Sequence, residues 1–453
     1  MRALSASDHL FLMLESKKQP MHVAGACVFE LPDTADDKFI ATLIEDMQIG
    51  KIPPSFPFNQ ILHKHLFWQT DENFRVQHHF RHIALPKPAG MAELFAYVSK
   101  EHSRIMDRQK PLWELHLIEG LAPESEGRPE RFALYLKIHH AMADGVAGMR
   151  LFQSMLSTSP TERLSLPIWA LATRQRNQID SLLPKDKSPY AIAKAQLGSI
   201  VPVGKELVTR FYDRHNTNFT SSFDAPACLL NQRIQASRQV VGQAFDKSRF
   251  EKIASAFDVT TNDVILAVCA GALRTYLLSQ DALPAKPLIA FVPVSLRKDD
   301  SKVGNQLSFL LANLATHKQD PIARLRTIAN SVIDGKTRFG RMNQTQIINY
   351  SAAIYGLAGI NLATGLYPTK QAFNLIISNV PGVKQSLYLN GARLSAIYPA
   401  SVLFDGQALN ITLANYQDKI DVGITACDIA LPDIGTLLTH LEDELVLLEH
   451  SLN

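Results

Sequence analysis

The chain has 453 residues, which is too long for one small module and fits two or three domains. Apolar residues make up 46% and charged residues 20%, the proportions of an ordinary globular protein rather than of a disordered or fibrous one. The formal net charge of +3 is too small to indicate nucleic acid as the main partner. We therefore expect a sizeable core and a function that depends on a local site.

Four cysteines stand at positions 27, 228, 269 and 427, and no two of them form a Cys-X-X-Cys pair. This spacing fits neither a disulfide framework nor a zinc site, so we predict reduced thiols in a cytoplasmic protein. The apolar N-terminal stretch contains two carboxylates and a histidine and has no small-residue cleavage site. We therefore expect it to form the first helix of the fold rather than a secretory signal.

Alternating hydrophobicity and breaker residues predict an α/β protein. In the first part of the chain we expect strands at 20–31, 62–69, 74–85, 113–121 and 131–140, and helices at 37–49 and 90–106. After residue 230 we expect strands at 238–245, 288–296, 307–316 and within 374–427, and helices at 246–256, 261–278 and 320–336. Strands that alternate with helices at this spacing indicate layered α/β domains.

A change of pattern divides the chain into two halves. Prolines and basic residues are frequent between the halves, so we predict an N-terminal domain at 1–160, a linker at 161–230 and a C-terminal domain at 231–453. Within the linker, residues 190–215 have helical spacing and a basic polar face. This segment fits either binding to an anionic membrane surface or packing as a crossover helix with a solvated face.

Residues 347–369 contain no charged side chain and are long enough to span a membrane. Polar residues, glycines and a proline interrupt the stretch, and it lacks flanking charge asymmetry. We interpret it as a buried or lipid-facing helix of a soluble protein. In such a helix, one stripe of small residues would form from Ala352, Gly356, Gly359 and Ala363.

The most informative motif is His139-His140-Ala141-Met142-Ala143-Asp144-Gly145, which follows a strand of period-two alternation. Adjacent histidines on a strand point to opposite faces, so only one can face a given cleft. The pair is a poor metal site for the same reason, and we predict no metal. A single histidine suits a general base, because the unperturbed pKa of histidine lies near neutral. Asp144 fits either orientation of the turn or a helix N-cap.

This motif resembles the HHxxxDG signature of the coenzyme A-dependent acyltransferase superfamily, which includes chloramphenicol acetyltransferase and the condensation domains of peptide synthetases. Further segments along the whole chain resemble the bacterial wax ester synthase/diacylglycerol acyltransferases. These segments are PMHVAG (20–25), HHFRHIALP (78–86), RQKPLWELHLIEGL (108–121), DAPACLLN (224–231), TTNDVILAVCAGALRTYL (260–277), VPVSLR (292–297), GNQLS (304–308) and ISNVPG (377–382).

The resemblance implies two chloramphenicol acetyltransferase-like domains, each a mixed sheet with flanking helices, and an active site at their interface. It also implies transfer of a long-chain acyl group from acyl-coenzyme A to a fatty alcohol or to diacylglycerol. His140 then removes the proton of the acceptor hydroxyl and protonates the departing coenzyme A thiolate, with His139 in support. We expect no acyl-enzyme and no bound cofactor, since acyl-coenzyme A is a co-substrate.

In the superfamily the aspartate of the motif is usually structural and paired with an arginine. For Asp144 we therefore expect an orienting role, with Arg297 as the candidate partner, and for Gly145 a structural role. Pro111 and Trp113 are expected to begin a strand and to pack behind the motif.

Asn262 is the candidate donor for the oxyanion that develops on the thioester carbonyl. An amide at the start of a helix adds the positive end of the helix dipole to its own N–H group. The alternative is that Asn262 is only the N-cap of that helix.

The apolar substrates extend these predictions to the small-residue stripe and to the location of the protein. The stripe fits either close helix packing or a tunnel for an acyl or alcohol chain. The substrates also imply a cytoplasmic protein that associates peripherally with membrane or lipid inclusions, and the sequence leaves its oligomeric state open.

Three alternatives to this function remain. They are an HHxxxDG acyltransferase for another hydroxyl or amine, a condensation-like module for carrier-bound thioesters, and a non-catalytic lipid-droplet coat. The absence of a carrier or adenylation region disfavours the second, and the intact HHAMADG motif disfavours the third.

Overall fold

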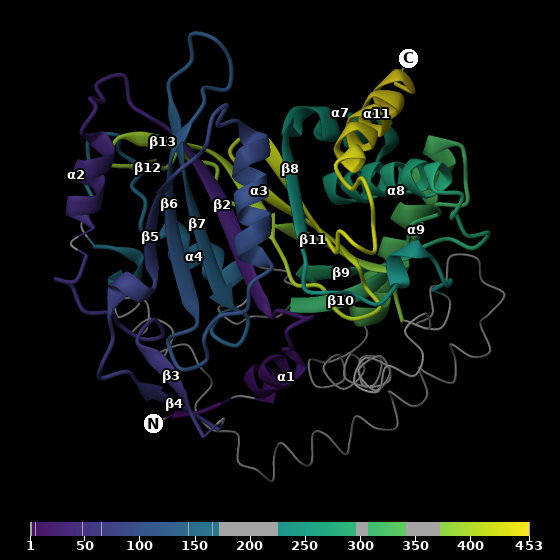
Figure 1. The fold of residues 1–453 in the computed structure, drawn as a ribbon. Coiled ribbons are helices and arrows are strands. Elements are labelled where there is room, and N and C mark those ends of the chain that lie inside the picture. The colour runs from purple at the N-terminus through teal and green to yellow at the C-terminus, as the bar shows by residue number, and fades with distance from the viewer. Residues whose placement is uncertain are drawn as a thin grey trace.

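The computed structural model describes residues 2–4, 6–47, 49–64, 66–143, 145–164, 166–171, 225–295, 307–340 and 372–452. In these residues two six-stranded sheets lie side by side, each with flanking helices, and a three-stranded sheet lies beside the first (Figure 1). Both large sheets are mixed, since β5 pairs parallel with β6, and β11 pairs parallel with β9 and β14. The predicted α/β fold with two sheet-rich halves is thus confirmed.

The first sheet has the strand order β12-β13-β2-β7-β6-β5. Its N-terminal strands are β2 (His22–Glu30), β5 (Phe80–Ala84), β6 (Trp113–Leu121) and β7 (Arg131–His139). Every residue of β7 is buried, because both faces of the sheet are covered. Leu134 and Ile138 pack with α2 (Phe39–Asp46) and α4 (Gly145–Gln153), whereas Tyr135 packs on the opposite face with α3 (Met91–His102).

The second sheet has the strand order β10-β9-β11-β14-β15-β8. Its strands are β8 (Gln239–Asp246), β9 (Ile289–Ser295), β10 (Leu307–Asn313), β11 (Leu375–Val380), β14 (Leu409–Tyr416) and β15 (Lys419–Ala426). The helices of its core are α7 (Lys247–Phe257), α8 (Thr261–Ser279), α9 (Pro321–Gly340) and α11 (Thr436–His450). Because α8 packs against α7, α9 and α11, it is apolar on nearly all sides, as a central helix must be.

Two strands from the second half of the chain belong to the first sheet. β12 (Tyr388–Leu389) and β13 (Ala392–Ala400) follow β11 in sequence, yet β13 pairs antiparallel with β2. The predicted boundaries place these residues in the C-terminal domain at 231–453, whereas in the structure they complete the first sheet. The reason is that β13 is mostly apolar and covers the open edge of β2, a partner choice that no local pattern encodes.

β13 passes over the second sheet at a pair of glycines. Gly242 of β8 and Gly423 of β15 lie opposite each other in the ladder. A Cβ atom on Gly423 would lie 1.9 Å from the carbonyl oxygen of Pro399, and one on Gly242 would lie 2.6 Å from Cδ1 of Tyr398. Only glycine therefore permits this close approach of one sheet to the other.

Helix α3 closes the same seam on the side of β8 (Figure 1). The Ser99 hydroxyl oxygen accepts a hydrogen bond from the N–H group of Val240 at 2.8 Å, and the Ser103 hydroxyl oxygen accepts one from that of Arg238 at 2.8 Å. These hydroxyls satisfy the backbone of an edge strand that would otherwise be exposed. The two halves are therefore joined by hydrogen bonds as well as by apolar contact.

Most predicted strands and helices are confirmed, and two differ in detail. The segment 62–69 is not one strand but the hairpin of β3 (Gln60–His63) and β4 (Phe67–Thr70), whose turn includes Lys64 with a positive φ of 50°. The segment 74–85 begins with the 3₁₀ turn η1 (Val76–His78) before β5. The other short elements are β1 (Arg2–Ala3), α1 (Ala6–Leu14) and η2 (Leu229–Asn231).

None of the described helices is by itself both long and apolar enough to cross a membrane. The bent pair of α7 and α8, with 105° between the two helices, passes the same test by length and composition. The residues of the predicted basic helix at 190–215 and of the uncharged segment at 347–369 lie outside the described residues.

The seam between the sheets also contains a buried carboxyl group. Asp421 on β15 accepts a hydrogen bond from the N–H group of Ile397 at 2.7 Å, and its Oδ1 has no partner among the described residues. Burial raises the pKa of Asp421 from 3.8 to about 7. Because the unfolded chain releases this proton at lower pH, the free energy of unfolding falls as pH rises from about 4 to about 7.

We expect Asp421→Asn to raise the melting temperature at pH 8 and to flatten its decline between about pH 4 and pH 7. Thermal unfolding followed by circular dichroism across this range measures the effect. Asp418→Asn changes an exposed carboxylate in the turn between β14 and β15 and should leave the pH dependence as it is. A difference between Asp421→Asn and the unmodified protein that is constant with pH would contradict the assignment.

Candidate active site

The two histidines of the motif belong to different local structures. β7 ends at His139, one residue before the predicted end of the strand, and His140 begins the turn that follows. The backbone N–H group of His140 donates to the carbonyl oxygen of Met21 at 2.8 Å. Phe11 of α1 stacks on the partly exposed His140 ring, with 3.9 Å between ring centroids and 17° between ring planes. The backbone and one ring face of His140 are thus held in place.

His139 is completely buried, and its contacts determine its tautomer. Its backbone N–H group donates to the carbonyl oxygen of Leu112 at 2.9 Å, and its Nδ1 accepts from the N–H group of Ala141 at 3.0 Å. Because Nδ1 is an acceptor, the proton of the neutral ring is on Nε2, which lies 3.3 Å from Oε1 of Glu15. Both ring nitrogens of His139 therefore face protein groups, whereas His140 is partly exposed.

Glu15 and Arg108 complete the support of His139. Arg108 Nε donates to Oε2 of Glu15 at 2.9 Å, and another guanidinium nitrogen of Arg108 donates to the carbonyl oxygen of Leu12 at 2.6 Å. Burial raises the pKa of Glu15, but its hydrogen bond with His139 and the hydrogen bond and charge of Arg108 outweigh burial, so that this pKa is lowered. An ionised carboxylate therefore lies next to the buried histidine.

The sequence does not assign a role to Glu15 or Arg108. In the sequence, Glu15 is only a charge in an apolar stretch, and Arg108 is only the first residue of the segment at 108–121. The two residues are 93 positions apart, so no local spacing connects them. A carboxylate at the end of an apolar stretch is nevertheless a signal, since a buried charge needs a partner.

Pro111 and Trp113 lie where the sequence predicts a structural role. Trp113 begins β6, is fully buried, and donates from its indole N–H to the carbonyl oxygen of Phe58 at 2.8 Å. Its backbone N–H group donates to the carbonyl oxygen of Pro111 at 2.9 Å. Leu112 between them holds the backbone of His139, so this segment packs directly behind the motif.

Other predicted residues receive less support or lie outside the described part of the chain. Gly145 is exposed at the start of α4, and a Cβ atom there would meet no heavy atom within 4 Å, so space does not require glycine at this position. Outside the described residues lie Asp144, its candidate partner Arg297, and the stripe of Ala352, Gly356, Gly359 and Ala363.

Asn262 is not the N-cap of α8, so that alternative is wrong. The cap is Thr260, whose hydroxyl oxygen accepts from the N–H group of Asp263 at 3.3 Å, while Asp263 accepts from the N–H group of Thr260 at 2.9 Å. Asn262 is the second residue of the helix, and its Oδ1 accepts from Nδ2 of Asn379 at 3.4 Å. Its side chain is therefore available for a task other than capping.

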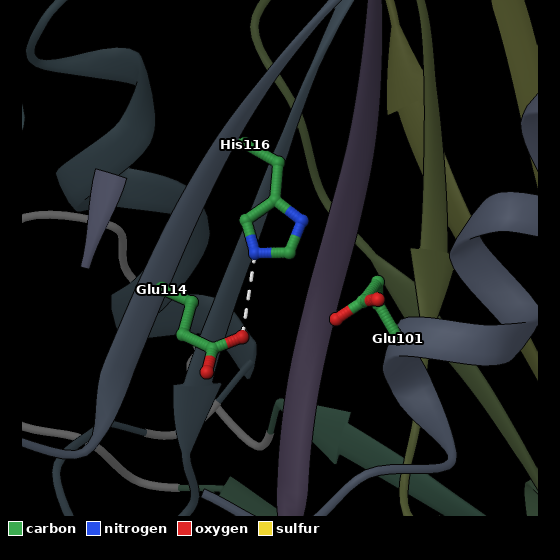
Figure 2. Close-up of side chains that lie close together, drawn as sticks. All are labelled: Glu101, Glu114 and His116. Atoms are coloured by element: carbon green, nitrogen blue, oxygen red, sulfur yellow. Dashed lines mark hydrogen bonds and ion pairs between the residues drawn. The ribbon is translucent and has the colours of Figure 1, made fainter. Parts of the chain in front are cut away.

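Figure 2 shows one cluster among the described residues with the spacing of metal ligands: Glu101, Glu114 and His116, whose ligand atoms lie within 4.8 Å of one another. Cations already balance these carboxylates. Arg81 Nη1 lies 3.2 Å from Oε2 of Glu101, and Arg81 Nη2 lies 3.6 Å from Oε1 of Glu114. Lys137 Nζ lies 3.9 Å from Oε2 of Glu114. Burial raises the pKa of Glu114, but His116, Lys137 and Arg81 hold it at about 2. We interpret the cluster as a charge network between α3 and β6.

Comparison with known proteins gives matches over the whole chain. The model of the wax ester synthase/diacylglycerol acyltransferase catalytic domain matches residues 4–265, and that of the C-terminal domain of the same family matches residues 303–449. O-acyltransferase WSD of Acinetobacter baylyi is 51% identical over 452 residues, which cover 99% of this chain and 97% of that protein.

Solved structures agree with these matches. The wax ester synthase/diacylglycerol acyltransferase from Marinobacter aquaeolei VT8 is 38% identical, with a TM-score of 0.81 and 100% of both chains covered. The starter condensation domain of rhizomide synthetase has a TM-score of 0.53 at 14% identity, with 100% of this chain and 94% of that chain covered. The second likeness concerns the fold alone.

The contact between Glu15 and His139 can be tested by removing one charge. We expect Glu15→Gln to lower kcat by about tenfold to a hundredfold, by analogy with the loss when the carboxylate partner of a metal-bound histidine is changed. Steady-state release of the thiol product measures kcat, and circular dichroism checks the fold. Glu45→Gln, which changes an exposed carboxylate of α2, is the matched control. An unchanged kcat in folded Glu15→Gln would contradict a supporting role of this carboxylate.

Proposed function

This chain belongs to the wax ester synthase/diacylglycerol acyltransferase family and is an O-acyltransferase, and we propose that His140 is the general base of its reaction. The observation that carries the proposal is the difference between the two histidines. His140 is partly exposed at the turn after β7, whereas His139 is buried between Glu15 and the N–H group of Ala141. Only one imidazole of the motif is thus accessible to an acceptor hydroxyl.

The donor substrate is acyl-coenzyme A, and the acceptor is a fatty alcohol or diacylglycerol. His140 takes the proton of the acceptor hydroxyl while the hydroxyl oxygen attacks the carbonyl carbon of the thioester. The carbon–sulfur bond then breaks, and the coenzyme A thiolate takes the same proton from His140. The products are an ester and free coenzyme A.

Direct attack needs no cysteine nucleophile. Burial raises the pKa of Cys228 to about 11 and that of Cys269 to about 12, and it also raises the pKa of Cys27. These three thiols are protonated at neutral pH and are poor nucleophiles. The predicted mechanism without an acyl-enzyme therefore remains our proposal.

Asn262 is the proposed donor to the oxyanion. Its position in the first turn of α8, within the positive end of the helix dipole, favours a developing negative charge nearby. Because Thr260 caps the helix, the Asn262 amide is not needed for that purpose. A single donor of this kind contributes about 3 kcal/mol to stabilisation of the transition state in other acyl transfers.

We expect His140→Ala to reduce thiol release from palmitoyl-coenzyme A by about a hundredfold to ten-thousandfold with hexadecanol and dipalmitoylglycerol as competing acceptors. Lipid products separate the two acceptors, and chloramphenicol serves as a third, small acceptor. His78→Ala removes an exposed histidine of η1 and should keep full activity. Full activity in His140→Ala would overturn the proposed base, and acylation of chloramphenicol alone would overturn the proposed acceptors.

We further propose that α1 and the β3–β4 hairpin dock on an anionic lipid surface of a membrane or lipid inclusion. Their side chains are exposed although apolar: Leu10 by 54%, Met13 by 79%, Leu66 by 51% and Phe67 by 37%. Exposed basic residues accompany them on the same elements and the adjoining turns: Arg2, Lys17, Lys18 and Lys64. Exposed apolar side chains accompanied by basic residues are typical of proteins that lie on anionic lipid.

The position of these elements relative to His140 supports the docking surface. β1 pairs with β4, and the N–H group of Leu4 donates to the carbonyl oxygen of Leu66, so that α1 and the hairpin are joined. α1 also supplies Phe11, which stacks on His140. A lipid substrate that leaves the docked surface therefore starts next to the proposed base.

Replacement of both Met13 and Phe67 by Gln should lower the fraction of protein that sediments with vesicles of phosphatidylglycerol and phosphatidylcholine. The loss follows from the apolar area removed, about 25 cal/mol per Å². Ile429→Gln removes an exposed apolar side chain after β15, 70% accessible, and serves as the control. Equal sedimentation of the unmodified protein, the Met13/Phe67 double variant and Ile429→Gln would rule out this surface as the docking site.

A further inference from the structure

Three asparagine side chains from three elements form one chain of hydrogen bonds. Asn415 of β14 donates from Nδ2 to Oδ1 of Asn379 on β11 at 2.6 Å. Asn379 in turn donates from Nδ2 to Oδ1 of Asn262 on α8 at 3.4 Å. Asparagine is disfavoured in strands. Its presence on the two parallel, paired strands β11 and β14 therefore indicates a role other than stabilising the sheet.

A backbone carbonyl determines which atom of each amide donates and which accepts in this series of hydrogen bonds. Asn415 Nδ2 also lies 3.2 Å from the carbonyl oxygen of Val380, which can only accept. Asn415 must therefore direct its NH₂ group, and not its oxygen, toward Val380 and Asn379. It follows that Asn379 presents Oδ1 to Asn415 and Nδ2 to Asn262, and that Asn262 must present Oδ1 to Asn379.

The backbone of Asn415 is itself held by the segment that contains Asn379. A Cβ atom on Gly382 would lie 1.4 Å from the carbonyl oxygen of Asn415. The turn after β11 therefore passes directly against Asn415, and glycine is needed there for close approach rather than for a positive φ. The ISNVPG segment thus contributes both an amide and the close contact that fixes its partner.

We propose that Asn379 and Asn415 are positioning residues that orient the amide of Asn262, so that Nδ2 and not Oδ1 faces the oxyanion. The proposal rests on the proposed function of Asn262 as oxyanion donor. Asn262 Nδ2 has no hydrogen-bond partner within the described ranges, while its Oδ1 is occupied by Asn379. A half-turn of the same amide would place an oxygen against the developing negative charge and turn stabilisation into repulsion.

The test compares two changes at Asn379. Asn379→Asp keeps the shape and still accepts from Asn415, but it cannot donate to Asn262, whose amide then turns Nδ2 toward the new carboxylate. Asn379→Ala removes the partner and leaves the Asn262 amide to rotate. We expect kcat to fall about a hundredfold in the Asp variant and only a few-fold in the Ala variant, with KM for palmitoyl-coenzyme A unchanged in both.

A merely structural role predicts the opposite order, because Ala removes a partly buried amide and leaves a cavity whereas Asp is isosteric. Kinetics with palmitoyl-coenzyme A and hexadecanol give the order, and melting temperatures show whether each variant is folded. Equal loss in both variants, or a larger loss in Asn379→Ala, would overturn the proposal.

The new carboxylate of Asn379→Asp has two possible effects: it repels the oxyanion directly, or it turns the Asn262 amide. A double-mutant cycle separates these two effects. If this carboxylate acts by turning the Asn262 amide, Asn379→Asp should cost nothing further in an Asn262→Ala background. A further loss in that background would show direct repulsion of the oxyanion and would overturn the positioning role. If Asn262→Ala alone retains full kcat at an unchanged melting temperature, the proposed donor itself is wrong, whatever Asn379 does.

Discussion

The close passage of β13 over β15 is the constraint on which the rest of the structure depends. Because Gly242 and Gly423 put no side chain between the sheets, their backbones meet, and α3 adds hydrogen bonds along the same seam. The core of the first sheet accordingly includes Ala414 and Tyr416 of the second. The motif after β7 and the asparagines of β11 and β14 are therefore placed by packed strands and not by the linker.

The two halves of the chain contribute different kinds of functional group. The first half supplies an imidazole whose backbone and ring face are held by Met21 and Phe11, with a carboxylate and a guanidinium beneath its buried neighbour. The second half supplies neutral amides in a directed chain. In the proposed reaction the imidazole of the first half transfers the proton, and the amides of the second half stabilise the transient oxyanion.

Local patterns in the sequence predict local structure well in this chain. The period-two run that ends at His139 and the helical run that begins at Thr261 are confirmed, because burial of one face leaves its period in the sequence. The same patterns miss contacts between distant residues, such as Glu15 with Arg108 and β13 with β2. They also leave the cap of α8 open, since Asn262 and Thr260 are both good capping residues and only the backbone decides between them.

The pairing of β13 with β2 also has a consequence for synthesis of the chain on the ribosome. β2 and β7 are complete by residue 139, but the strand that covers the outer edge of β2 ends only at residue 400. At ordinary rates of translation this edge stays open for on the order of tens of seconds. An apolar, unpaired edge is a template for association with other chains, so the nascent protein is open to such association until β13 has been made.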